Sequence, residues 1–184
     1  MARKRIIDLG HAFREVPWAI PALFATLVIA LLVHRWLAQR FRVSPWFMLA
    51  LMLCVGSILS ITLTPGNWNP SPHCNLRIIF PRPSDLLSLT ERSLNIWLFV
   101  PLGLTLSFTP RPRVGVLLFV GAMALPFMIE GFQLVVPGIG RSCQATDIVN
   151  NLTGLFLGCI AGLSVRLLRL GIIKDVRRKA DQTS

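Results

Sequence analysis

The polar residues best suited to chemistry lie at the ends of two long apolar runs, within residues 126–158. Glu130 and Gln133 are three residues apart in the first run, so a helix would place them on one face. Arg141 follows in the short loop between the runs. A guanidinium pairs well with phosphate or carboxylate, and a buried glutamate could serve as a general acid or base. Ionisable groups at such depth usually mark a site in a membrane protein.

The second apolar run carries a polar end and a stripe of small residues on one helical face. Asp147, Asn151, Gly154, Gly158 and Gly162 follow one another at spacings of four, three, four and four residues, which keeps them on one side of a helix. The three glycines form a small-xxx-small pattern that lets a neighbouring helix approach closely. We therefore predict that the glycines pack against another helix and that Asp147 and Asn151 lie at the polar end of this stripe.

Each polar residue also has a structural explanation. Asp147 could cap its helix, where a carboxylate interacts favourably with the helix dipole. Asn95 and Asn151 could form hydrogen bonds between helices, and Arg141 could neutralise an acidic neighbour. Glu130 is the hardest to explain in this way, because a glutamate deep in an apolar run needs a partner or must be protonated.

The composition indicates an integral membrane protein. Hydrophobic residues make up 53% of the chain and charged residues only 15%, whereas a soluble domain carries about 25% charged residues. The apolar residues form uninterrupted blocks, which suit helices because lipid requires internally satisfied backbone groups. The alternating ten-residue pattern of barrel strands is absent from the sequence. We predict an all-α fold, a polytopic membrane helix bundle with about five transmembrane helices.

Five apolar segments define the expected domain organisation. The predicted spans are residues 17–33, 46–63, 94–108, 114–136 and 147–168. They form one membrane domain, residues 17–168, between a basic N-terminal tail (1–16) and a basic cytoplasmic tail (169–184). We expect no signal-peptide cleavage, because no small-residue cleavage site follows the first apolar run.

The distribution of charge predicts the orientation in the membrane. The net charge is +11, and the basic residues lie beside the apolar spans, as topology signals and contacts with anionic lipid do. The bilayer therefore explains the charge without nucleic acid. Placing the C-terminus in the cytoplasm puts eleven of the 19 basic residues on that side. The candidate binding residues then gather near the outer boundary: Asn95, Glu130, Gln133, Arg141, Asp147 and Asn151.

The four cysteines fall into two groups. Cys54 and Cys159 lie within predicted spans, where a free cysteine behaves as a small apolar residue. Cys74 and Cys143 lie in loops on the predicted outer face, where a disulfide can persist. They could pair or remain two unrelated thiols. Because no Cys/His spacing suggests a metal site, we predict neither a metal nor another cofactor.

Several separated motifs over about residues 75–165 resemble one known family. They are Asn95 six residues before Pro101-Leu102-Gly103, then Glu130-Gly131-Phe132-Gln133, Arg141-Ser142 and Asp147-Ile148-Val149-Asn150-Asn151-Leu152-Thr153-Gly154. This arrangement resembles the VanZ-like family. The resemblance implies a multi-pass protein of the bacterial inner (plasma) membrane. The founding member is associated with low-level resistance to teicoplanin, a lipoglycopeptide that binds peptidoglycan precursors at the outer membrane face.

The first hypothesis is a cell-envelope membrane protein with an outward-facing polar site. The site would bind the anionic headgroup of a membrane lipid or of a lipid-linked glycan such as a cell-wall precursor, and could affect glycopeptide susceptibility. Arg141 would pair with phosphate or carboxylate, while Glu130 and Asp147 would bind hydroxyls or orient Arg141.

Two other hypotheses remain open. In one, the protein is an intramembrane enzyme that uses Glu130 as its catalytic acid or base on a lipid-linked substrate. The sequence offers no Ser/His/Asp set, no DxxD metal motif and no obvious nucleophile, which argues against this enzyme. In the other, the protein is a structural helix bundle or a homo-oligomeric scaffold joined through the glycine stripe. A transporter is disfavoured because five spans without a repeat make a poor pathway.

Overall fold

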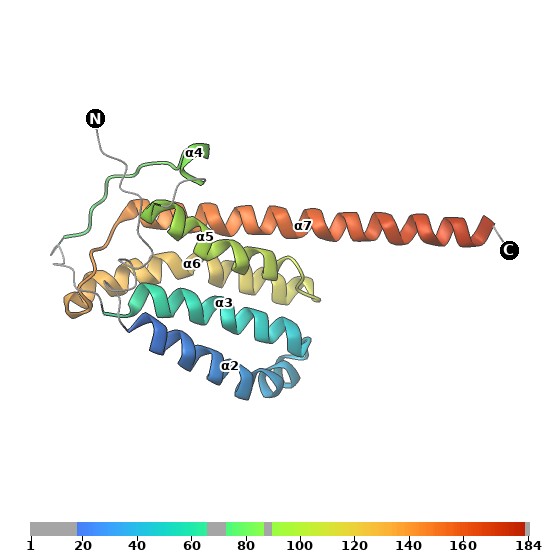
Figure 1. Cartoon of the computed structure of the whole chain (residues 1–184), viewed down its shortest axis with the longest axis horizontal. Coiled ribbons are helices and arrows are strands. Elements are labelled where there is room, and N and C mark those ends of the chain that lie inside the picture. Colours follow the sequence, from blue (N-terminus) through green and yellow to red (C-terminus); the bar gives the residue numbers. More distant parts are fainter. Residues whose placement is uncertain (1–17, 66–72, 87–89, 183–184) are drawn as a thin grey trace.

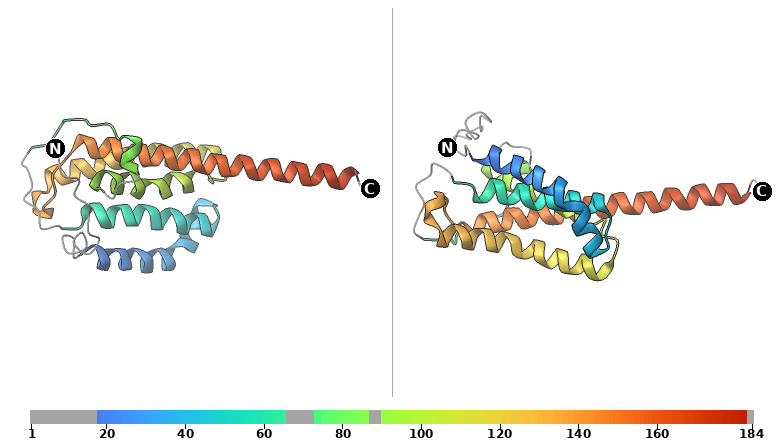
Figure 2. Two further views of the ribbon diagram at one scale, coloured as in Figure 1. Left: turned by 45° about the horizontal axis from the view of Figure 1, so that its top comes forward. Right: turned by 90° about the horizontal axis from the view of Figure 1, so that it is seen from below.

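Helices account for most of the backbone in the computed structural model, which describes residues 18–65, 73–86 and 90–182 (Figure 1). The helices are α2 (Ala19–Phe41), α3 (Pro45–Leu63), α4 (Pro83–Leu86), α5 (Glu91–Leu106), α6 (Pro112–Val135), the 3-10 helix η1 (Pro137–Ile139) and α7 (Ala145–Gln182). The five long helices run roughly along one axis, and α7 projects beyond the others at its C-terminal end (Figures 1 and 2). The predicted all-α bundle is confirmed.

Four helices in the described part of the chain are long and apolar enough to cross a membrane: α2, α3, α6 and residues 145–172 of α7. The fifth long helix, α5, has 16 residues. It is therefore about 24 Å long, which is less than the roughly 30 Å thickness of a bilayer core. Within α5, Phe99 and Leu102 are almost completely buried. The shortest of the five helices thus forms the centre of the bundle.

The core joins α3, α5, α6 and α7. Its buried side chains are Ile58, Phe99, Leu102, Leu106, Ala122, Ile129 and Leu155. The helix α2 packs mainly on α3, at the side of the bundle away from α7 (Figure 1). Many large apolar side chains of α2, α6 and α7 face outward. This is expected for helices surrounded by lipid, because lipid offers polar groups on the outer surface no hydrogen-bond partners.

Two helices extend further than the sequence predicts. The first span was expected to end at Val33, but α2 continues to Phe41. His34 does not interrupt the helix, because its Nδ1 lies 3.0 Å from the carbonyl oxygens of Ala30 and Leu31. The last span was expected to end at Leu168, but the helix continues through most of the predicted tail. Lysine and arginine are good helix formers, so the charges that end a membrane span do not end a helix.

The helices α5 and α7 are parallel and touch through backbone atoms. A Cβ atom added to Gly154 would collide with the carbonyl of Ile96, and one added to Gly158 would collide with the carbonyl of Val100. Gly103 of α5 faces the α7 backbone in the same way. The glycine stripe of α7 is therefore filled by α5 of the same chain. The pairing also brings the N-terminal ends of both helices to one end of the bundle.

Candidate functional site

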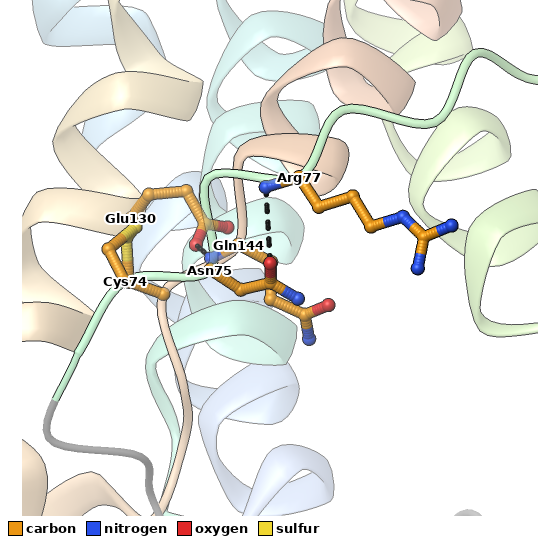
Figure 3. The surroundings of a disulfide bond; sticks show 6 residues. Cys74, Asn75, Arg77, Glu130 and Gln144 are labelled. Atoms are coloured by element: carbon orange, nitrogen blue, oxygen red, sulfur yellow. Dashed lines mark hydrogen bonds between the residues drawn. A yellow bond between two sulfur atoms is a disulfide. The ribbon is translucent and has the colours of Figure 1, made fainter.

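A disulfide-linked segment covers the end of the bundle where α7 begins. We call residues 73–82 the strap. Cys74 of the strap forms a disulfide with Cys143, 69 residues later in the sequence, with a Cα–Cα distance of 4.6 Å (Figure 3). Next to it, Asn75 and Gln144 form an isolated parallel β-bridge. The Asn75 N–H donates to the Cys143 carbonyl, and the Ala145 N–H donates to the Asn75 carbonyl, both at 2.9 Å.

Thr146 fixes the strap to the first turn of α7. Its buried hydroxyl donates to the Arg77 carbonyl at 2.7 Å and accepts from the Ile79 N–H at 3.3 Å. The Arg77 N–H in turn donates to the Asn75 Oδ1 at 3.1 Å (Figure 3). One short side chain thereby satisfies two backbone groups of the extended segment beyond its single β-bridge at Asn75. The disulfide and Thr146 together define where the strap lies.

Glu130 connects the end of α6 to the loop before α7. The side chain is only 3% exposed, and its Oε2 accepts the backbone N–H of Gln144 at 2.7 Å (Figure 3). A hydrogen bond to a carboxylate is among the stronger ones in proteins. Arg141 and Asp147 lie close enough to interact electrostatically with the Glu130 carboxyl group. Three charged residues that are apart in sequence therefore meet at this end of the bundle.

Gln133 and Arg141 both reach the C-terminal turn of α3. Gln133 Nε2 donates to the Thr62 carbonyl at 3.0 Å, and Arg141 Nη2 donates to the Ile61 carbonyl at 2.7 Å. The last carbonyls of a helix have no partner within the helix and carry partial negative charge. A cation and an amide donor are well suited to this position. These contacts hold Arg141 beside the end of α3.

The asparagines lie on the two parallel helices at the same end of the bundle. Asn95 of α5 is half-buried, while Asn150 and Asn151 of α7 are 0% and 2% exposed. Within the described residues, both amide atoms of Asn150 and the Oδ1 of Asn151 are buried without a hydrogen-bond partner. Such groups are uncommon in folded proteins. Asn150 was not singled out from the sequence, which offers no signal for it beyond its position next to Asn151.

The comparison with family models identifies the chain. The VanZ/LLP1 family model matches residues 46–166, well over half of the sequence. The chain belongs to the VanZ/LLP1 family. The predicted VanZ-like relationship is thus confirmed, and the match begins at the start of α3 rather than near residue 75. No match was found among curated proteins or among solved structures.

In this VanZ/LLP1 protein the predicted polar residues gather at one end without forming a single network. Glu130, Gln133, Arg141 and Asp147 surround the loop before α7. Within the described ranges, the Asn95 side chain forms no hydrogen bond to another residue. The same ranges contain no group of three or more His, Cys, Asp or Glu side chains able to hold a metal ion. The described residues at this end offer hydrogen-bond donors and acceptors, the carboxyl groups of Glu130 and Asp147, and the charge of Arg141.

Removing the disulfide should destabilise this end of the VanZ/LLP1 protein. We expect Cys143→Ser to lower the free energy of unfolding by about 2–4 kcal/mol, because the crosslink closes a long loop. For a chain of this size, this corresponds to a melting temperature about 4–16 °C lower. The measurement is thermal unfolding in detergent under non-oxidising and oxidising conditions. Cys54→Ser, a change at a free thiol of α3, serves as the control, and equal melting temperatures for all three proteins would contradict the prediction.

Proposed function

We propose that this VanZ/LLP1 protein binds the anionic headgroup of a membrane lipid or of a lipid-linked cell-wall glycan at the strap end of the bundle. The observation that carries the proposal is the position of Arg141. Its guanidinium lies at the C-terminus of α3 with Nη2 2.7 Å from the Ile61 carbonyl. Arginine carries five donors in a planar fork and recognises phosphate and carboxylate well. A headgroup at the membrane boundary would meet this cation.

We propose further that this site faces the outside of a bacterial cell membrane and that the C-terminus is cytoplasmic. The Cys74–Cys143 disulfide supports this orientation, because disulfides persist in oxidising compartments and are rare in the cytosol. The opposite end of the bundle carries exposed arginines in the last two turns of α2, after α2, and at the start of α6: Arg35, Arg40, Arg42, Arg111 and Arg113. Basic residues in short loops favour the cytoplasmic side.

Glu130 has a positioning role in this proposal. It is buried, and it accepts the N–H of Gln144, three residues beyond Arg141. A general acid or base must come within hydrogen-bond reach of its substrate. The burial of Glu130 and its bond to the loop backbone indicate that this side chain holds the loop that carries Arg141. We therefore favour binding over catalysis.

The proposed function predicts an effect at the cell surface. In a host that lacks the gene, expression of the wild-type chain should raise teicoplanin tolerance above that of the empty vector, because a bound headgroup would alter access to the membrane precursors. Arg141→Ala should abolish the increase. Arg111→Ala, which removes one charge at the opposite end, should keep it.

The measurement is susceptibility to teicoplanin and vancomycin at matched membrane expression. Glu130→Gln provides a further comparison, because it removes a charge but keeps an oxygen acceptor for the loop. A wild-type chain that changes neither antibiotic response would contradict the glycopeptide effect. Equal loss with Arg141→Ala and Arg111→Ala would contradict a site at the strap end.

A further inference from the structure

We propose that a lipid-facing hollow between α3 and α5 holds a hydrocarbon chain of the same ligand, so that the protein recognises an intact anionic lipid through both headgroup and tail. This inference rests on the proposed function and adds the second half of the binding site. It commits to a ligand that carries a phosphate or carboxylate group and a long apolar chain in one molecule, as opposed to a free glycan or phosphate.

The hollow has a volume of about 260 Å³ and an apolar lining. Its wall consists of Leu53, Cys54, Ser57, Trp97, Leu98 and Pro101. Small side chains at Cys54 and Ser57 leave space on the α3 side. Pro101 lies inside α5 and is exposed. Hydrocarbon fills such a surface well, because a chain in a hollow gains dispersion contacts that a flat helix face does not offer.

The α3 wall of the hollow lies close to the end of α3 that Arg141 contacts. Cys54, Ser57 and Ile61 follow one another at spacings of three and four residues, so they lie on the same side of the helix. From Ser57 to Ile61 is one helical turn, or about 6 Å. The Ile61 carbonyl is the group that accepts from Arg141 Nη2. The hollow and the cation thus follow one another along α3, about one helical turn apart, in the order of the tail and headgroup of an anionic lipid.

The position of Trp97 supports the same arrangement. Its ring lines the hollow and its indole N–H donates to the Leu86 carbonyl of α4 at 3.0 Å. Tryptophan favours the boundary between headgroups and hydrocarbon because one part of its ring is apolar and the other donates a hydrogen bond. Trp97 therefore indicates that the end of the hollow nearest α4 lies at this boundary, where a lipid headgroup begins.

A second hollow of similar volume provides an internal control. It also measures about 260 Å³ and lies between α3, α5 and α6, with Leu51, Leu106 and Leu117 in its wall. These residues belong to the half of the bundle away from Arg141. Gly121 also lines this hollow, and a Cβ atom there would meet nothing within 4 Å. Filling it with a large side chain should leave lipid recognition at Arg141 unchanged.

The test is photo-crosslinking on the purified full chain. The protein is placed in phosphatidylcholine nanodiscs that contain a small fraction of phosphatidylglycerol with a diazirine in one acyl chain. After irradiation, crosslinked peptides should map to residues 53–57 of α3 and 97–101 of α5. Ser57→Trp should reduce this signal about tenfold, equivalent to about 1.4 kcal/mol of binding, and Gly121→Trp should not. A phosphatidylcholine probe with the same chain should label these residues weakly.

The outcomes separate the tail site from the headgroup site. If Arg141→Ala removes the selective labelling but Ser57→Trp does not, the tail site is wrong and the proposed function stands. If phosphatidylglycerol and phosphatidylcholine probes label equally and Arg141→Ala has no effect, both proposals fail. Each variant must elute like the wild type and retain the Cys74–Cys143 disulfide, and Ser57→Leu replaces Ser57→Trp if the larger residue prevents folding.

Discussion

Gly158→Leu is expected to abolish folding of the bundle. A side chain at this position would collide with the carbonyl of Val100 and crowd the amide of Leu104. These are backbone atoms of α5, so no rotamer change can relieve the contact. Overpacking in a core usually costs about 1–3 kcal/mol, and separation of two touching helices should cost more than that. Because α5 forms the centre of the bundle, its displacement also opens the core around Phe99 and Leu102.

A matched leucine on α6 controls for the general effect of a larger apolar residue. Gly131 lies on an exposed face of α6, where an added Cβ would meet nothing within 4 Å. We expect Gly131→Leu to elute and melt like the wild type, while Gly158→Leu yields aggregated protein or none. The measurement is the fraction of membrane-extracted protein in the monodisperse peak, followed by its melting temperature. A Gly158→Leu protein that melts within a few degrees of wild type would refute close backbone contact between α5 and α7.

Glu130→Ala is expected to be the most damaging single change in the polar cluster. It leaves the N–H of Gln144 without its carboxylate acceptor. Loss of a hydrogen bond to a charged group costs about 1.5–3 kcal/mol. The loop that carries Arg141 should lose its fixed position, so headgroup binding should fall together with stability. Glu130→Gln keeps one oxygen acceptor in nearly the same place and should retain most of both properties.

The order of the two variants distinguishes positioning from proton transfer. Melting temperature and lipid retention are measured for Glu130→Ala, Glu130→Gln and Met128→Ala, the last being a truncation on an exposed face of the same helix. A positioning role predicts that the alanine variant is clearly worse than the glutamine variant and that Met128→Ala behaves as wild type. If glutamine were as harmful as alanine to binding while leaving the fold intact, the charge or proton of Glu130 would itself be required.

Regular sequence patterns correctly predicted the position of one helix and the packing face of another. The helix α3 begins and ends within one residue of its predicted limits, because Pro45 starts the helix and no charged residue interrupts it. The stripe of Gly154, Gly158 and Gly162 faces a neighbouring helix, because spacings of four residues keep the three glycines on one helical face. Helix ends were predicted poorly at charged residues. A charge limits burial in lipid, but it does not limit the helical hydrogen bonds of α2 or α7.

The contacts of the strap could not be deduced from the sequence. The bridge between Asn75 and Gln144 joins positions far apart in the chain, and the bonds of Thr146 to the strap are made to backbone atoms. Backbone groups are present at every residue, so such contacts leave no residue pattern. The same reason hides the bond from Glu130 to the Gln144 N–H. The sequence predicted that these polar residues lie at one end, and the structure adds the contacts of Glu130, Gln133 and Arg141.

The most direct test of the headgroup site is lipid retention by purified protein. Wild type, Arg141→Ala and Arg111→Ala are extracted from membranes that contain equal phosphatidylglycerol and phosphatidylcholine, and bound lipids are counted by native mass spectrometry. We predict that the wild type retains phosphatidylglycerol preferentially, that Arg141→Ala loses this preference at least about tenfold, and that Arg111→Ala behaves as wild type. Equal retention by all three proteins, or equal loss in both variants, would contradict an anionic headgroup site at Arg141.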